Sequence, residues 1–243
     1  MPSPADTLLR EHCSAHHGVI RREDAHQMGL SDRQIRLRVA RGVLRSVAPN
    51  VFVLGGAPTS PAQALLAAVW AVDGAASHES GAWVHGILDD PPDPPHVSTV
   101  HDRHRSLHRE LMVMHRPLVL TRSDVTRRKG FAVTTVERTL CDVGAVVDLD
   151  TVRDCCDRAL RGRLTHPDRI VRRFLQLGGR GRPGSAAIRS VLSEIDADVM
   201  LLESDLESML LRLLDATGLP RPTLQHRVVA GGRRYRLAMA YPD

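Results

Sequence analysis

The fold is decided by residues 18–54, which read GVIRREDAHQMGLSDRQIRLRVARGVLRSVAPNVFVL. Ser31 is a residue type typical of a helix N-cap, and Gln34 three residues later completes a capping box that satisfies free backbone amides. Leu30 and Ile35 supply the hydrophobic staple that often accompanies such a start. Gly42 is the residue type that commonly follows a helix C-terminus. We therefore predict a helix from Ser31 to the residue before Gly42.

The neighbouring segments complete a larger motif. A short helix is predicted over Arg22–Met28, and Gly29 makes the turn between the two helices. After the second helix, Val43–Val47 and Val51–Leu54 are predicted strands, joined by Ala48-Pro49-Asn50. This order is typical of a winged helix-turn-helix, in which the strand pair forms the wing.

The predicted second helix has a distinct outer face. At 100° per residue, Ile35 and Val39 share an inward face. Arginine pairs with guanine and glutamine with adenine in the major groove of DNA, while flanking arginines can hold phosphates. The predicted DNA-contacting residues are the outward Arg33, Gln34, Leu37 and Arg41, the flanking Arg36 and Arg38, and Arg45 in the wing.

Composition gives a simpler alternative for the same arginines. The chain is rich in arginine throughout and Lys129 is its only lysine, so arginines are expected on any solvated helix face. The formal net charge of +5 is compatible with a nucleic-acid partner but does not require one. Aromatic residues make up only 3% of the chain, which argues against a base-stacking surface for single strands. The predicted partner is therefore double-stranded DNA.

The cysteines and the hydropathy pattern indicate a cytoplasmic protein. The four cysteines, Cys13, Cys141, Cys155 and Cys156, form no CxxC pair and predict free thiols in a reducing compartment. No segment has the length and apolar character of a membrane span or an N-terminal signal. We expect no membrane partner.

The remaining pattern predicts an α+β protein of three parts. The parts are a winged helix-turn-helix at 1–56, a mixed α/β middle domain at 57–178 and a segment at 185–243. The glycine-rich stretch GGRGRPG at 178–184 is interpreted as a flexible linker. Within the middle and last parts, the predicted helices are 60–72, 77–87, 134–145, 151–161, 167–177 and 202–216, and the predicted strands are 96–101 paired with 111–115, 131–134, and a final pair around Gly231-Gly232.

Several short motifs together resemble a known family. They are Gly29-Leu30-Ser31, Gly42–Val53, Ser77–Ala82 with His85-Gly86, Val133–Asp142, Arg182–Ser185, and Glu203–Glu207 followed by Gly218-Leu219-Pro220. In this order they resemble AbiEi-type antitoxins of type IV toxin-antitoxin systems, joined to a C-terminal region similar to Vsr-like, restriction-type endonucleases. The resemblance implies a transcriptional regulator that represses its own operon by binding its own promoter. It also implies an antitoxin that counteracts a nucleotidyltransferase-like toxin.

The chain departs from the endonuclease pattern at its C-terminus. Enzymes of this fold hold a divalent metal with several converging carboxylates. Ala238 stands where the first strand acid is expected, and the next acidic strand is missing before Asp243. Glu203 and Glu207 are spaced as surface charges on a helix. We therefore predict no enzyme activity, no catalytic residues and no metal or other cofactor.

Other constellations give weaker signals. His101, His104 and His108 have zinc-like spacing, but the arginines that surround them would repel a cation, so no metal is predicted there. Cys141 lies on an apolar helix face, which is typical of a core residue rather than a nucleophile. Two further functions stay open: a DNA-targeted Vsr-like endonuclease relative that is inactive or incomplete, and a pure protein-interaction module whose arginine helix is merely solvated.

Overall fold

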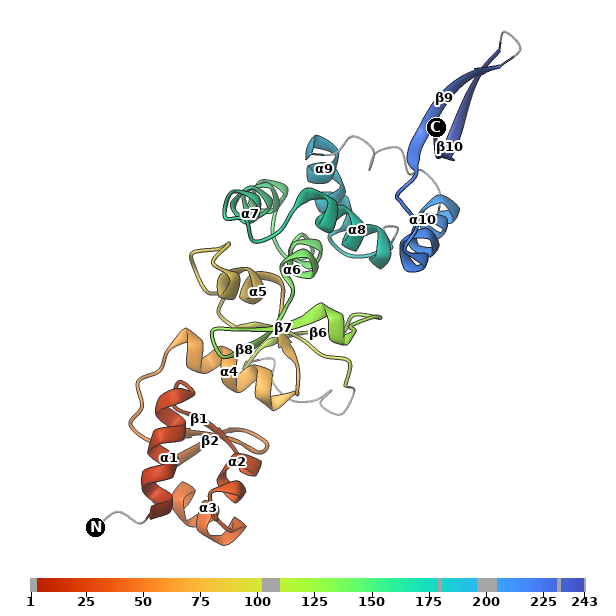
Figure 1. Ribbon diagram of the computed structural model, residues 1–243. Coiled ribbons are helices and arrows are strands. Elements are labelled where there is room, and N and C mark those ends of the chain that lie inside the picture. Colours follow the sequence, from red (N-terminus) through yellow and green to blue (C-terminus); the bar gives the residue numbers. More distant parts are fainter. Residues whose placement is uncertain (1–3, 102–109, 179–180, 196–204, 231–232, 243) are drawn as a thin grey trace. The chain divides into compact units, whose positions relative to one another are not determined.

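The computed structural model describes residues 4–101, 110–178, 181–195, 205–230 and 233–242. They form two compact units, residues 1–135 and residues 136–243, each of which is described by itself (Figure 1). The chain mixes helices with several sheets, as the sequence predicts.

The first unit begins with three helices around a small sheet. The elements are α1 (Pro4–Ala15), β1 (Val19–Arg21), α2 (Arg22–Gln27), α3 (Asp32–Ala40), β2 (Leu44–Ala48) and β3 (Val51–Leu54). The three strands are antiparallel in the order β1-β3-β2. The sequence analysis predicts α2, α3, β2 and β3 to within one or two residues but does not identify α1 or β1. Leu9 and Cys13 of α1 are fully buried against Ile20, Ile35 and Phe52, so the missed helix completes the core of this subdomain.

The rest of the first unit is built on a five-stranded sheet. Its elements are α4 (Pro61–Ala71), β4 (Ala75–Ala76), α5 (His78–His85), β5 (His96–Ser98), β6 (Val113–His115), the 3-10 turn η1 (Arg122–Asp124), β7 (Val125–Arg128) and β8 (Phe131–Thr134). The strand order is β6-β5-β4-β8-β7. The predicted pairing of β5 with β6 is confirmed, and the strands run parallel. The sequence analysis does not identify β4 and β7.

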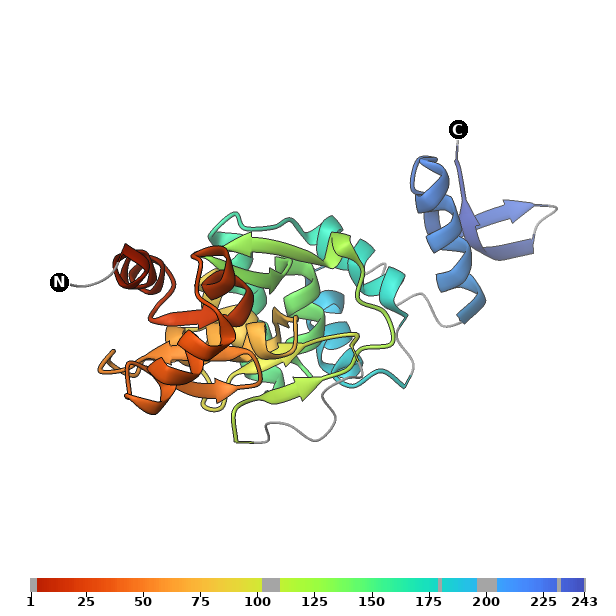
Figure 2. The ribbon, with the colours of Figure 1, turned by 90° about the horizontal axis from the view of Figure 1, so that it is seen from below.

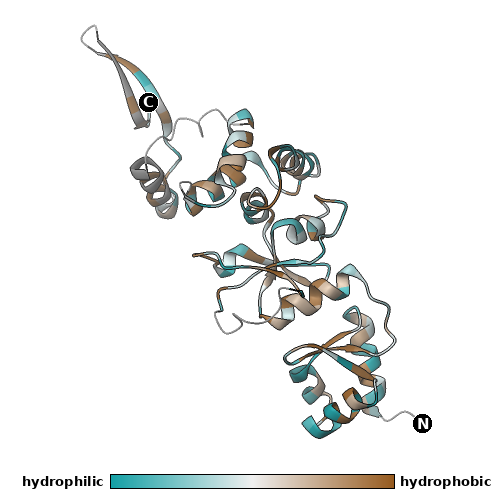
Figure 3. Cartoon of the chain, turned by 180° about the vertical axis from the view of Figure 1, so that it is seen from behind, coloured by the Kyte–Doolittle hydropathy of each residue, from teal (hydrophilic) through white to brown (hydrophobic). Residues whose placement is uncertain are grey.

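One apolar core joins the two sheets of this unit. α4 is apolar over almost its whole surface (Figure 3), and Leu66 and Val69 pack with Val19 and Val53 of the first sheet and Phe131 of the second. A helix that is apolar on all sides is stable only when it is covered on all sides. The domain boundary expected at residue 57 therefore lies inside one compact unit.

The second unit consists of helices followed by a hairpin. The helices are α6 (Val136–Val143), α7 (Leu149–Arg161), α8 (Pro167–Leu177), α9 (Ser185–Ile195) and α10 (Asp205–Thr217), and the strands are β9 (Thr223–Ala230) and β10 (Arg233–Ala240). α6 contacts α7, α8 and α9. The antiparallel β9–β10 hairpin follows α10 (Figure 2). Glu203 lies outside the described residues.

The described part of the expected linker contacts α6 and the residues that follow it. The Arg182 side chain donates to Asp142 of α6. A side chain at Gly184 would collide with the backbone of Gly144 and Ala145, so only glycine fits this approach. The prediction of a flexible linker fails here because its glycine serves close packing.

Candidate nucleic-acid interface

α3 starts as the sequence predicts. The Ser31 hydroxyl accepts a hydrogen bond from Gln34 N at 3.3 Å, and Gln34 Oε1 accepts one from Ser31 N at 2.8 Å. This reciprocal pair confirms the capping box. Leu30 and Ile35 are both buried, and Gly42 has a φ of +72°, the left-handed conformation expected after a helix end.

The outer face of α3 is exposed, and its inner face packs as predicted. Ile35 is fully buried and Val39 is half-buried against the core of the first subdomain. The exposed residues include the predicted Arg33, Gln34, Arg36, Leu37 and Arg41. Leu37 is 44% exposed, which is high for a leucine. The helix thus presents arginines around an apolar side chain.

Three of the predicted arginines are fully available to a ligand. Within the described part of the chain, the side chains of Arg33, Arg41 and Arg45 make no ion pair or hydrogen bond, and all three residues are exposed. Arg45 lies on β2, opposite Val53 of β3. Guanidinium groups of this kind can bind a phosphate or a base edge without first losing another partner.

Arg38, predicted as a flanking phosphate contact, has partners within the first unit. Its Nε and Nη2 atoms donate to Asp6 Oδ1 of α1 at 3.1 and 2.7 Å, and its Nη1 donates to Gln34 O at 3.2 Å. The side chain is only 16% exposed. Arg38 therefore joins α3 to α1, because a carboxylate 32 residues away reaches it.

The side-chain amide of Gln34 is also partly occupied by hydrogen bonds within the protein. Its Oε1 atom accepts from both the backbone N and the hydroxyl of Ser31. Bidentate recognition of adenine needs the oxygen and the nitrogen of the amide together. Gln34 can therefore read adenine in this way only by giving up the cap.

The structure adds Arg22, which the sequence analysis does not single out. Arg22 Nη1 donates to Asp32 at the start of α3, and Nε donates to Asn50 Oδ1 at 2.8 Å in the β2–β3 turn. Its guanidinium lies 5.5 Å from the centre of the Phe52 ring. Asn50 has a φ of +63°, which asparagine tolerates better than most residues. The only sequence signal is the pair of adjacent arginines that precedes two acids.

Two carboxylates near α3 are paired with arginines, Asp32 with Arg22 and Asp24 with Arg21. The Arg22 hydrogen bond holds the pKa of Asp32 below its ordinary value, with smaller contributions from His26 and Arg36. Burial alone would raise the pKa of Asp24, but hydrogen bonds from Arg21 lower it overall. Both carboxylates thus stay charged and paired, and the free charge on this surface is positive.

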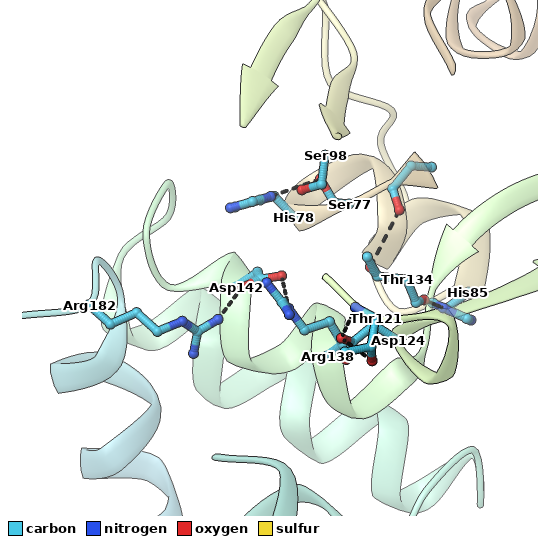
Figure 4. Close-up of polar contacts among 11 residues, drawn as sticks. Ser77, His78, His85, Ser98, Thr121, Asp124, Thr134, Arg138, Asp142 and Arg182 are labelled. Atoms are coloured by element: carbon cyan, nitrogen blue, oxygen red, sulfur yellow. Dashed lines mark hydrogen bonds and ion pairs between the residues drawn. The ribbon is translucent and has the colours of Figure 1, made fainter. Parts of the chain in front are cut away.

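A second polar cluster lies between α5 and strands β5 and β6 of the five-stranded sheet (Figure 4). Ser98 Oγ donates to Ser77 Oγ at 2.8 Å, and Ser77 Oγ lies 2.9 Å from His78 Nδ1. The His78 and His115 rings stack at 3.5 Å, and His115 Nε2 lies 3.2 Å from His96 Nδ1. Burial, together with His115, lowers the pKa of His96 to about 4. Hydrogen bonds and ring contacts among these hydroxyls and imidazoles therefore connect α5 with β5 and β6.

A third cluster belongs to the second unit. Arg138 Nε donates to Asp142 Oδ2 at 2.7 Å, and Arg182 donates to the other carboxylate oxygen (Figure 4). Arg138 is fully buried. Nearby, burial raises the pKa of the Cys141 thiol to about 12, so this cysteine stays protonated. The four cysteines form no disulfide, as predicted, and all of them are buried.

The described residues hold no group of three or more His, Cys, Asp or Glu side chains placed to bind a metal ion. His101 lies 3.7 Å from Asp73. The other histidines of the zinc-like motif, His104 and His108, lie outside the described residues. No helix in the described ranges is long and apolar enough to cross a membrane.

Comparison with known proteins gives one match. Residues 8–55 match the family model described as "Transcriptional regulator, AbiEi antitoxin". The matched segment begins within α1 and ends just after β3, so it covers the capped helix, the arginine face and the hairpin. The chain matches no curated protein significantly. The match supports a relationship of this N-terminal segment to antitoxin regulators.

Proposed function

We propose that this protein is a DNA-binding transcriptional regulator of the AbiEi antitoxin type, with α1 to β3 acting as a winged helix-turn-helix. α3 enters the major groove, and the β2–β3 hairpin contacts the adjacent backbone through Arg45. The observation that carries the proposal is the exposed, unpartnered pair Arg33 and Arg41 on a helix fixed by its cap and core. The family match over residues 8–55 supports the same reading.

We further propose that the regulator represses its own operon. Its partner is duplex DNA of its own promoter, and a nucleotidyltransferase-like toxin is the protein that its system counteracts. The endonuclease-like C-terminal segment makes no catalytic contribution in this proposal. A DNA-nicking assay with Mg²⁺ or Mn²⁺ checks the last point, since turnover abolished by Glu203→Ala would contradict it.

The direct test measures binding of the full chain to a labelled duplex from its own upstream region and to an unrelated duplex. We expect tighter binding to the upstream duplex. The logarithm of the binding constant should fall linearly with the logarithm of salt concentration, with a slope of about −0.9 for each phosphate contacted. Arg33→Ala should weaken specific binding by about 1–3 kcal/mol if the side chain pairs with a base.

A matched variant separates groove recognition from general charge. Arg172 on α8 is exposed like Arg33 and has no ion pair in the described part of the chain. Arg172→Ala removes the same charge without touching α3, so it should leave affinity unchanged. Equal loss from both variants, or no shift of any duplex at low salt, would overturn the proposal in favour of a protein-interaction module.

A further inference from the structure

The outer edge of the five-stranded sheet carries a surface that DNA binding does not use. β7 ends the strand order and pairs only with β8 among the described strands. Asp124 O accepts from Thr135 N, and hydrogen-bonded pairs alternate along an antiparallel ladder. Arg127 therefore directs its backbone N–H and C=O groups away from β8. Val125 directs its C=O the same way, while its N–H donates to Arg122 O in η1. Such an edge can template another extended chain.

An apolar groove accompanies this edge. It has a volume of about 670 Å³ and is lined mainly by apolar surface from Leu120, Thr121, Arg122, Val125, Thr126, Arg127 and Ala132. The chain that leads into it exposes Leu118 completely and Val119 by 56%. Neighbouring apolar side chains exposed to this degree are typical of an interaction surface.

The charges around the groove are of one sign. Residues 116–132 contain five arginines and lysines but only one acid, Asp124. Asp124 is buried and accepts hydrogen bonds from the backbone and the hydroxyl of Thr121. In the described part of the chain, Arg122, Arg127, Arg128 and Lys129 form no ion pair. The groove therefore favours an acidic occupant.

We propose that β7 and this groove bind an acidic, extended protein segment, which adds a sixth strand to the sheet. Its backbone pairs with the N–H and C=O of Arg127 and with the C=O of Val125. Its alternate apolar side chains enter the groove, and its carboxylates meet Arg127 and Lys129. Charges on an edge strand also discourage aggregation, but a purely protective edge would not place Leu118 and Val119 beside it. Nucleic acid fits less well, because the described residues that line the groove include no aromatic side chain for base stacking.

The test uses the full chain and synthetic peptides. The probe is a fluorescent, end-blocked nonapeptide of alternating glutamate and valine, with fluorescence anisotropy as the readout. One control peptide replaces glutamate with lysine. A second keeps the glutamates but carries N-methyl groups on alternate residues, which removes the donors that a strand edge needs. We expect the acidic probe to bind saturably and each control to bind at least about tenfold more weakly, equivalent to about 1.4 kcal/mol.

Protein variants then locate the site by exchanging its charge. The double variant Arg127→Glu with Lys129→Glu should bind the acidic probe about tenfold more weakly and the lysine peptide more tightly than the wild type does. Arg172→Glu on α8 reverses one positive charge elsewhere and should alter neither affinity. Leu118→Asp changes a fully exposed residue and should also weaken the acidic probe without reducing the thermal midpoint of unfolding.

Each contrary result has a definite meaning. Equal binding of the acidic and N-methylated peptides would exclude strand addition, and equal binding of both charges would exclude the cationic rim. Loss of duplex binding in the double variant would make this surface part of a nucleic-acid site. Concentration-dependent dimers abolished by Arg127→Glu would assign the edge to a second copy of the chain. The proposal is independent of promoter binding, which is measured separately on Arg33→Ala.

Discussion

Two groups of arginines in this chain occupy opposite environments. Arg33 on α3 and Arg41 at its C-cap are exposed, and their side chains have no partner in the described part of the chain. In the second unit, Arg138 is fully buried and shares Asp142 with Arg182. The first group can donate hydrogen bonds to a ligand, whereas the second already donates to Asp142 within the protein.

The contrast shows what helical periodicity reveals about an arginine and what it does not. Periodicity places Ile35 inward and Arg33 outward, and both placements hold. It cannot identify an arginine that forms an ion pair with a carboxylate far away in the sequence, as Arg38 does with Asp6. Pairing, more than exposure alone, therefore separates the structural arginines from those available for recognition.

The largest predicted effect on stability comes from removing Asp142, the partner of the buried Arg138. Asp142→Asn removes the carboxylate that accepts from the buried guanidinium of Arg138, which should cost about 3–5 kcal/mol of unfolding free energy. Urea denaturation followed by circular dichroism measures the loss. Asp157→Asn on α7 removes a carboxylate that is 51% exposed and pairs with Arg161, and it should cost no more than about 1 kcal/mol. Similar losses from both substitutions would contradict the assignment.

The next effect concerns pH. Since burial lowers the pKa of His96 to about 4, the native state keeps this ring neutral while the unfolded chain takes up a proton near pH 6.5. Stability from this group is complete above pH 6.5 and is lost as pH falls from 6.5 to 4, by about 3 kcal/mol in total. Denaturation at pH 7 and pH 5 should show a smaller pH dependence for His96→Gln. An unchanged dependence would mean that other groups carry it.

Some elements were predictable because their signals are local. α8 spans Pro167–Leu177 as predicted, with proline at its first turn and glycine just after it. The cap of α3 lies within four residues and is equally readable. Local chemistry of this kind fixes the start and the end of a helix whatever surrounds it.

Other features depend on contacts between distant residues. β4 is two residues long and exists because β5 and β8 flank it. The orientation of β5 and β6 cannot be read from two short apolar segments. At the candidate site, the exposed arginines were predictable from spacing, but Arg22 was not, because its role depends on Asn50, 28 residues away.

An intermediate effect compares two arginines on the same helix. Arg41→Ala removes an exposed, unpartnered guanidinium and should weaken promoter binding by about 1–3 kcal/mol with little effect on stability. Arg38→Ala removes the link to Asp6, so it should lower unfolding free energy by up to about 1 kcal/mol and leave the salt dependence of binding unchanged. Titrations at several salt concentrations distinguish the two. A reduced salt slope for Arg38→Ala would return it to the DNA-contacting set.

The smallest effect tests whether Gln34 serves the helix or the DNA. Ser31→Ala removes the cap and should cost about 1 kcal/mol of stability. Gln34→Glu keeps the reciprocal capping box and places a negative charge at a helix N-terminus, so stability should stay the same or rise slightly. The same charge would repel phosphates if the side chain faces DNA. Stability retained with weaker promoter binding would place Gln34 at the interface as well as in the cap, whereas retention of both would leave it a capping residue alone.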